Sequence, residues 1–177
     1  NQKGFSFDVL IEDSIFETNI FLLAYNKIKL IEYASFFGSM EIIYFIIREG
    51  VNPNLSMWLY GIHSENSELV HFLEDQKILP NDNEFEKILK ESIRCQHIDV
   101  SKYIINYLIK EEDLEIDKEN HYQYNIYKYS VEFCNYTFFP DNIKYKFMFH
   151  YLCEFGNYIL VNLYLKNEDI DINLSII

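Results

Sequence analysis

The fold is decided by residues 30–54, which read LIEYASFFGSMEIIYFIIREGVNPN. Two short helical patterns flank Gly38, and each places apolar or small side chains on one helix face. The first face carries Ile31, Ala34 and Ser35, and the second carries Ile42, Ile43, Ile46 and Ile47. Gly38 can take the left-handed conformation that ends a helix, and Ser39 can cap the helix that follows. Because Gly50 and Pro53 end the second helix, the stretch predicts one helix–turn–helix unit.

The same pattern returns three times further along the chain, which indicates an internal repeat. The second unit carries Trp58, Gly61 and Ile62, followed by Leu69, Val70 and Leu73. The third unit carries Leu89, Ser92 and Ile93, followed by Val100, Ile104 and Ile105. Asn83 with Glu86 three residues later predicts the start of this third unit, and a fourth begins near Phe149 with Gly156 in the turn. The small residues Ala34, Gly61 and Ser92 recur at one place in the first helix, where they let neighbouring helices approach closely.

Two segments do not follow the pattern. Residues 119–141 are rich in aromatic side chains, namely Tyr122, Tyr124, Tyr127, Tyr129, Tyr136, Phe138 and Phe139. They form either an aromatic binding loop or, as we favour, a diverged helical insertion or repeat whose rings pack on its neighbours. In the first 29 residues, Phe5 to Ile11 alternates loosely, and Phe16 to Ile28 predicts a helix that caps the repeats.

The composition excludes several classes of partner. The 177 residues carry a formal net charge of −13, which repels the phosphates of nucleic acids and anionic membrane surfaces. A partner protein with a basic segment would instead be attracted. No apolar run is long enough to cross a bilayer.

Three separated cysteines argue against a disulfide framework and favour a reducing, cytoplasmic compartment. Because the chain starts without Met, it reads as part of a longer protein.

A search for catalytic chemistry finds no convergent set of groups. The histidines, at His63, His71, His97, His121 and His150, form no HExxH motif. Nucleophile-elbow and phosphate-binding glycine motifs are also missing from the sequence. Cys95 and His97 are two residues apart on a predicted helix start, so their side chains diverge. We therefore expect a protein that is not an enzyme and has no cofactor and no metal site.

The repeated unit resembles the ankyrin repeat, a helix pair with a glycine turn followed by a glycine–alanine–aspartate–valine–asparagine type ending. The residues in register are Ile31, Ala34, Ser35, Gly38, Ile42, Ile43, Ile46, Ile47, Gly50, Val51, Asn52 and Asn54. More narrowly, LIEYASFFGSMEIIYFI, SMWLYGIHSENSELVHFLE and LKESIRCQHIDVSKYI are similar to an uncharacterised domain found with ankyrin repeats in large protozoan protein families. This narrower likeness covers about residues 15–110.

The chain departs from the ankyrin pattern in three respects. The Thr-Pro start of the first helix is absent, and Glu65 and Gln96 stand where the turn glycine belongs. The step from Ala34 to Gly61 is 27 residues, shorter than the usual period of about 33. The hairpin between the first two units is therefore expected to be a bare turn, which weakens the case for partner contacts there.

The resemblance implies an all-α solenoid of about four degenerate helix–turn–helix repeats that binds another protein. The expected segments are a helical cap (1–29), three repeats (30–54, 55–81 and 82–118), the aromatic segment (119–141), and a further repeat with the start of a next one (142–177). The concave surface of an ankyrin array is formed by its first helices. The positions that correspond to it, and so the candidates for partner binding, are Tyr33, Phe36, Phe37, Tyr60, His63, Glu91, Arg94, Tyr151 and Glu154.

An alternative function stays open. The chain would then be a structural or capping segment of a longer ankyrin array, with no partner of its own beyond the rest of that array. The apolar ending INLSII favours this alternative, because terminal repeats must present a polar outer face.

Overall fold

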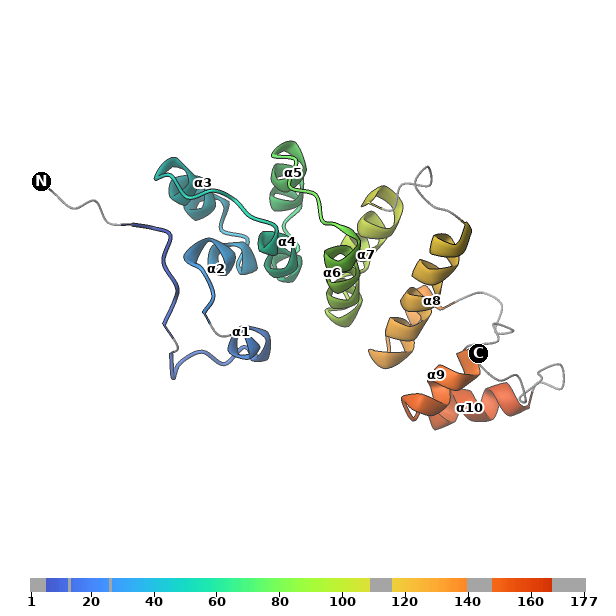
Figure 1. Ribbon diagram of the computed structural model, residues 1–177. Coiled ribbons are helices and arrows are strands. Elements are labelled where there is room, and N and C mark those ends of the chain that lie inside the picture. The colour runs from blue at the N-terminus through green and yellow to red at the C-terminus, as the bar shows by residue number, and fades with distance from the viewer. Residues whose placement is uncertain (1–5, 13, 26, 109–115, 140–147, 167–177) are drawn as a thin grey trace, which may run out of the picture. The chain divides into compact units, whose positions relative to one another are not determined.

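The computed structural model describes residues 6–12, 14–25, 27–108, 116–139 and 148–166 (Figure 1). Within these ranges the regular structure is helical, with one isolated antiparallel bridge between Leu10 and Lys29. The expected all-α class is therefore confirmed. The chain divides into two compact units, Asn1–Ile88 and Leu89–Ile177. The expected start of a next repeat, with the INLSII ending, lies outside the described residues.

The first unit contains two helix pairs and a short preceding helix. Its helices are α1 (Ile20–Ala24), α2 (Leu30–Phe36), α3 (Met40–Arg48), α4 (Ser56–Gly61) continued by η1 (Ile62–Ser64), and α5 (Ser67–Asp75). Helix α2 contacts α3, α4 and η1, and α4 contacts α5. The first helices of the two pairs therefore lie side by side, each against its own second helix. Helix α6 (Asp82–Arg94) begins in this unit and ends in the next.

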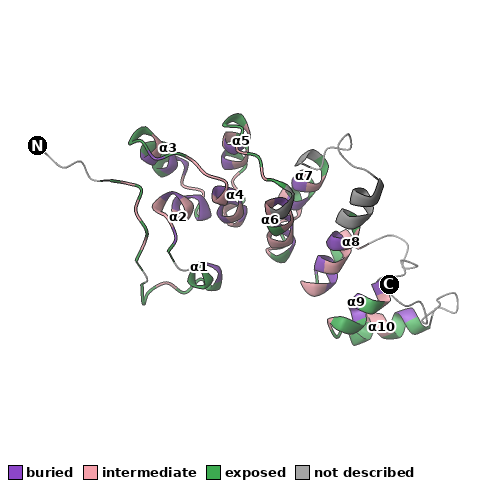
Figure 2. Cartoon of the chain, viewed as in Figure 1, coloured by how far each residue is buried: buried purple, intermediate pink, exposed green. Residues whose placement is uncertain are grey.

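Burial in the first unit follows the predicted helix faces closely (Figure 2). The buried residues that the repeat pattern predicted here are Ile31, Ala34, Ser35, Ile43, Ile46, Trp58, Gly61, Ile62, Leu69 and Leu73. The prediction was wrong for Ile42, which is 49% exposed. On α3 the buried side chains are Met40, Ile43 and Ile46, spaced by three residues. Because consecutive residues are about 100° apart around a helix, Ile42 points away from this stripe.

The second unit is also built from helix pairs. After α6 come α7 (Ile98–Tyr103) continued by η2 (Ile104–Leu108), α8 (Ile116–Glu132), η4 (Tyr136–Phe138), α9 (Met148–Glu154) and α10 (Tyr158–Leu165). Helix α8 contacts η4 and α9, and α9 contacts α10. One core cluster consists of Val131, Met148, Tyr151, Leu152 and Tyr164. The aromatic segment is thus helical over α8 and η4.

One turn geometry recurs after each first helix. The residue that ends the helix has a positive φ in five places, namely Gly38 (62°), Glu65 (51°), Gln96 (60°), Cys134 (55°) and Gly156 (70°). The turn is thus kept at Glu65 and Gln96, where the sequence lacks glycine. The turn at Cys134 was not anticipated, and it gives the aromatic segment the same helix–turn form as its neighbours. At Gly38 the space is also closed, since an added Cβ would lie 2.8 Å from the Ser64 Cβ.

In all five turns, the backbone carbonyl at one equivalent position accepts a hydrogen bond. It belongs to the residue four positions before the left-handed one, which is Ala34, Gly61, Ser92, Ser130 or Leu152. In four turns the acceptor bonds the amide that follows the left-handed residue, from Ser39 (3.0 Å), His97 (3.2 Å), Asn135 (2.9 Å) and Asn157 (2.8 Å). In the second pair, the Ser64 hydroxyl donates to the Gly61 carbonyl instead (2.7 Å). Each first helix therefore ends with a closed hydrogen-bonded loop.

Two expected helix starts are corrected by the structure. Helix α6 begins at Asp82, and its cap is Asn81, whose Oδ1 accepts from the Glu84 amide (3.2 Å), so the box predicted at Asn83 is wrong. The helix expected over residues 16–28 is confined to Ile20–Ala24. Asn19 caps it by accepting from the Phe21 amide (2.9 Å), and Lys27 has a positive φ of 69°, which a helix cannot continue through.

Replacing Gln96 by glycine is expected to raise the free energy of unfolding by about 1 kcal/mol, because glycine takes a positive φ without the steric cost that a Cβ brings. Urea denaturation followed by circular dichroism measures the change. Lys87→Gly is the control, since Lys87 is an exposed residue inside α6 and the same substitution should there cost about 1 kcal/mol. Equal destabilisation by the two variants would contradict the left-handed turn at Gln96.

Candidate functional site

The candidate site consists of side chains at matching positions of the first helices. Five residues before each left-handed residue stand Tyr33, Tyr60, Glu91, Tyr129 and Tyr151. Two residues before it stand Phe36, His63, Arg94, Glu132 and Glu154. Sequence reasoning missed Tyr129 and Glu132 because Cys134 does not mark a turn as glycine does. The pattern of Tyr five residues before the turn is a signal that could have found them.

The structure divides the nine predicted partner-binding residues into three groups. Phe37 is 56% exposed, and Arg94 and Glu154 are also exposed. Tyr33, His63 and Glu91 are half-buried. Phe36, Tyr60 and Tyr151 are buried, with exposed fractions of 8%, 5% and 2%. The first two groups are accessible to solvent, whereas the buried group contributes mainly to packing.

In the first unit, Phe21 of α1 lies inside an aromatic cluster formed by the predicted residues. Its ring is stacked on Phe36 (5.9 Å between centroids) and meets Tyr60 edge-on (5.4 Å). It also lies 4.0 Å from the His63 ring, which in turn stacks on Phe36 at 4.7 Å. Phe21, Phe36 and Tyr60 form one buried core cluster with Leu22 and Ile28, and the half-buried His63 lies at its side. The predicted face of α2 and α4 therefore already holds a segment of its own chain.

The hydroxyl groups of this cluster have altered acidity. Burial raises the pKa of Tyr60 to about 12, and the nearby Glu32 carboxylate and Tyr25 add to the shift. Burial also raises the pKa of Tyr33, together with the hydrogen bond that its hydroxyl donates to Glu17 Oε2 (3.2 Å). Both phenols are therefore neutral at ordinary pH, and Tyr33 acts as a hydrogen-bond donor to a carboxylate.

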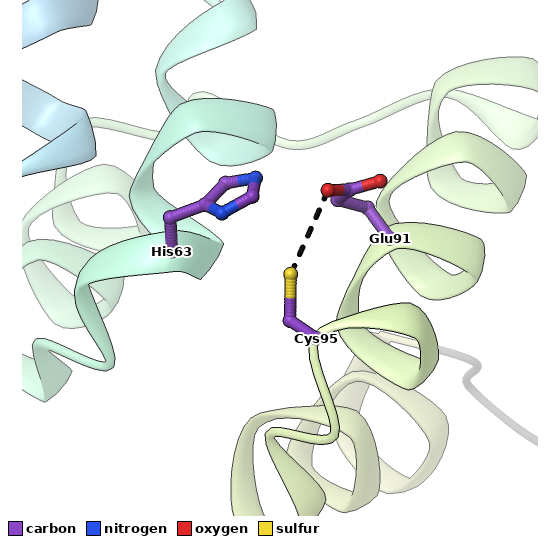
Figure 3. A group of neighbouring side chains, drawn as sticks. All are labelled: His63, Glu91 and Cys95. Atoms are coloured by element: carbon purple, nitrogen blue, oxygen red, sulfur yellow. Dashed lines mark hydrogen bonds between the residues drawn. The ribbon is translucent and has the colours of Figure 1, made fainter. Parts of the chain in front are cut away.

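In the second unit, Glu91 and Arg94 of α6 pair with each other. The Arg94 Nε donates to Glu91 Oε2 at 2.8 Å, and Arg94 Nη2 donates to Glu91 Oε1. Cys95 Sγ lies 3.6 Å from Glu91 Oε1 (Figure 3). Figure 3 also draws His63, which belongs to the first unit. At the C-terminal end of α6, Glu91 and Cys95 are neighbouring side chains of types that can bind a metal ion, and the Glu91 carboxylate is here paired with Arg94.

Lys90 connects α6 to α8 within the second unit. Its ammonium group lies 3.0 Å from Glu132 Oε1 and sits over the rings of Tyr129 (5.1 Å) and Phe133 (5.5 Å). Partial burial strengthens such a cation–π contact, because less water competes for the ammonium group. The rings of Tyr129 and Phe133 thus contact Lys90 of the neighbouring helix α6.

Tyr151 occupies the corresponding position on α9. Its ring meets Tyr124 of α8 edge-on (5.1 Å) and belongs to the buried cluster of this unit. Burial raises its pKa above the ordinary value for tyrosine. Next to it, Glu154 is exposed, and its Oε2 lies 3.6 Å from His150 Nε2. Of the two residues predicted on α9, Glu154 is therefore the accessible one.

Asparagine side chains hold neighbouring first helices in register. Asn66 Nδ2 donates to the Gly38 carbonyl (2.9 Å) in the first unit, and Asn135 Nδ2 donates to the Ile93 carbonyl (3.1 Å) in the second. Each asparagine directly follows the left-handed residue of its own turn and reaches the turn of the preceding pair. In these two places, the bonds align the candidate residues of one first helix with those of the next first helix in the same unit.

Comparison with known proteins gives no relative: no family model, no curated protein and no solved structure matches the chain. Among the described helices, none is both long enough and apolar enough to cross a membrane.

The raised pKa of Tyr60 predicts a loss of stability in alkali. Below pH 10 the phenol is neutral in the folded and unfolded states, so its contribution is fully present. Between pH 10 and about 12 the unfolded chain loses this proton while folded Tyr60 keeps it, and the free energy of unfolding falls. Denaturant titrations across this range should show a smaller fall for Tyr60→Phe. Tyr158→Phe, at a 71% exposed position, is the control, and an equal effect of both variants would contradict the assignment.

Proposed function

We propose that the chain is a degenerate ankyrin-type repeat protein that binds another protein through its first helices and has no catalytic activity. The observation that carries this proposal is the docking of α1 against α2 and α4. There an apolar helix is already held by Phe36, Tyr60 and His63, which are three of the predicted binding residues. A surface that holds one short helix through aromatic side chains has the chemistry needed to hold another.

Each unit also carries accessible residues on its own first helices. Phe37 lies 5.0 Å from Tyr33 and 5.1 Å from Phe36, at the exposed edge of the aromatic cluster. In the second unit, Arg94 and Glu154 each stand two residues before the left-handed residue that ends their own first helix. Aromatic and arginine side chains contribute most of the energy in protein interfaces. The recurrent turn and the buried small residues support the ankyrin-type classification.

The alternative, a structural segment of a longer array, is favoured by helix α10. Its exposed apolar side chains are Tyr158, Ile159, Leu163 and Leu165, with exposed fractions of 71%, 58%, 56% and 51%. A helix at the polar end of a repeat array would not present such residues. This alternative predicts self-association that Ile159→Lys/Leu163→Lys abolishes, which sedimentation velocity measures.

The binding function predicts that Phe37→Ala/Arg94→Glu/Glu154→Lys abolishes capture of a partner. The charge changes cancel, and all three side chains are exposed, so the variant should fold normally. The measurement is affinity capture from a lysate of the cell that makes the protein, with bound proteins identified by mass spectrometry and confirmed by titration of the purified partner. The expected loss of affinity is at least tenfold.

The matched control is Ile42→Ala/Glu49→Lys/Lys102→Glu, which alters exposed residues of second helices or their ends with the same cancelling charges. It should capture the partner as the native chain does. If both triple variants lose the partner, or neither does, binding through the first helices is wrong.

A further inference from the structure

The docking of α1 has a consequence for the kind of partner. We infer that α1 and the residues before it are an internal ligand of the groove-like surface made by Phe36, Tyr60 and His63 on α2, α4 and η1, here called the groove. We infer that the partner is a protein segment of the same chemistry: a short helix with a phenylalanine and a carboxylate four residues before it. This inference rests on the proposed function and specifies its ligand. The carboxylate is represented here by Glu17 and the phenylalanine by Phe21.

The phenylalanine is the anchor of the segment. Phe21 is 7% exposed, and its ring is surrounded by Phe36, Tyr60 and His63 at centroid distances of 4.0 to 5.9 Å. Leu22, which is 3% exposed, joins the same cluster. A buried aromatic ring in a well-packed pocket is what typically dominates the energy of peptide recognition. The groove therefore selects an aromatic residue followed by an aliphatic one.

The carboxylate fixes the direction of the segment. Glu17 Oε2 accepts from the Tyr33 hydroxyl (3.2 Å), while its Oε1 accepts from the Asn19 amide (2.8 Å). Asn19 then caps α1 by accepting from the Phe21 and Leu22 amides (2.9 and 3.3 Å). One glutamate thus joins the groove and the start of the helix. A partner that preserves the spacing from glutamate to phenylalanine can reproduce both contacts.

Helix α1 is short, and one side of it is exposed. Helix α1 has five residues, too few to be stable without its docking contacts. Its outer side chains are exposed, with Ile20 at 80% and Leu23 at 54%. A cavity of about 60 Å³ remains between the segment and α2, lined in part by Leu22 and Tyr33. The residues before α1 are held by backbone hydrogen bonds from Ile11 N to Ile28 O (2.8 Å) and from Leu30 N to Val9 O (3.0 Å). The short connection from Tyr25 to α2 also keeps the local concentration of the segment high.

A peptide exchange experiment tests the inference. The ligand is a fluorescein-labelled peptide of residues 6–25, and binding to the full chain is measured by fluorescence anisotropy. In Phe21→Ala/Leu22→Ala the internal segment is released, so this chain should bind the peptide at least tenfold more tightly than the native chain does. Ile20→Ala/Leu23→Ala is the matched control from the same helix, and it should exclude the peptide as the native chain does.

Variants of the peptide test the recognition chemistry. A peptide with Phe21→Ala should bind the released chain at least tenfold more weakly, whereas Ile20→Ala in the peptide should change affinity by less than twofold. Glu17→Gln should weaken binding several-fold. A second form of the protein, with a protease site inserted after Lys27 and cleaved in the folded state, should exchange its native segment for the labelled peptide. This arm keeps the test valid if Phe21→Ala/Leu22→Ala fails to fold.

A foreign partner is tested by selecting random peptides from a phage library on the released chain. The expected consensus is an acidic residue four positions before a phenylalanine. Three outcomes overturn the inference. If the released and cleaved chains do not bind the peptide, α1 is only a structural cap. If the native chain forms dimers that exchange segments, the ligand is a second copy, and if the selected peptides lack the consensus, the recognition chemistry is wrong. The capture experiment of the proposed function depends on Phe37, Arg94 and Glu154, not on α1. If that experiment succeeds and the peptide experiments fail, this inference alone is refuted.

Discussion

The structure depends on a hydrogen bond to a backbone carbonyl that closes the end of each first helix. The chain reverses there through a left-handed residue, and the carbonyl four residues earlier is satisfied either by the next amide or, at Gly61, by the Ser64 hydroxyl. Without this bond that carbonyl would have no hydrogen-bond partner, at a cost in stability of about 1–3 kcal/mol. The turn persists at Glu65, Gln96 and Cys134 although a side chain there makes positive φ unfavourable. The packing of the helix pairs therefore outweighs local preference.

This balance explains how far the sequence could predict the structure. Gly38 and Gly156 marked their turns because glycine has an evident preference, and the small residues Ala34, Gly61 and Ser92 gave the spacing of the first helices. Cys134 carried no such mark, so the helix pair around it was anticipated only as an aromatic insertion or diverged repeat. Burial on α3 was predicted too broadly, because the pattern of four isoleucines does not say on how many sides the helix is covered.

The sequence suggested residues for the candidate site, but it did not predict the packing of Phe21 against them. Tyr33, Phe36, Tyr60 and His63 follow from the helix register, which is a local property of the sequence. The docking of Phe21 onto them is a contact between residues far apart in the chain, and no periodicity encodes it. The apolar pattern of residues 16–28 indicated a cap, yet it could not show that Phe21 packs against Phe36, Tyr60 and His63.

The asparagine bonds between neighbouring turns give the chain a direction. Asn66 and Asn135 each donate to a carbonyl that lies earlier in the sequence, at Gly38 and Ile93. Because a chain leaves the ribosome from its N-terminus, each acceptor carbonyl is synthesised before the asparagine that donates to it. Within each unit, a helix pair that has closed its turn can therefore offer a fixed carbonyl to the asparagine of the pair that follows.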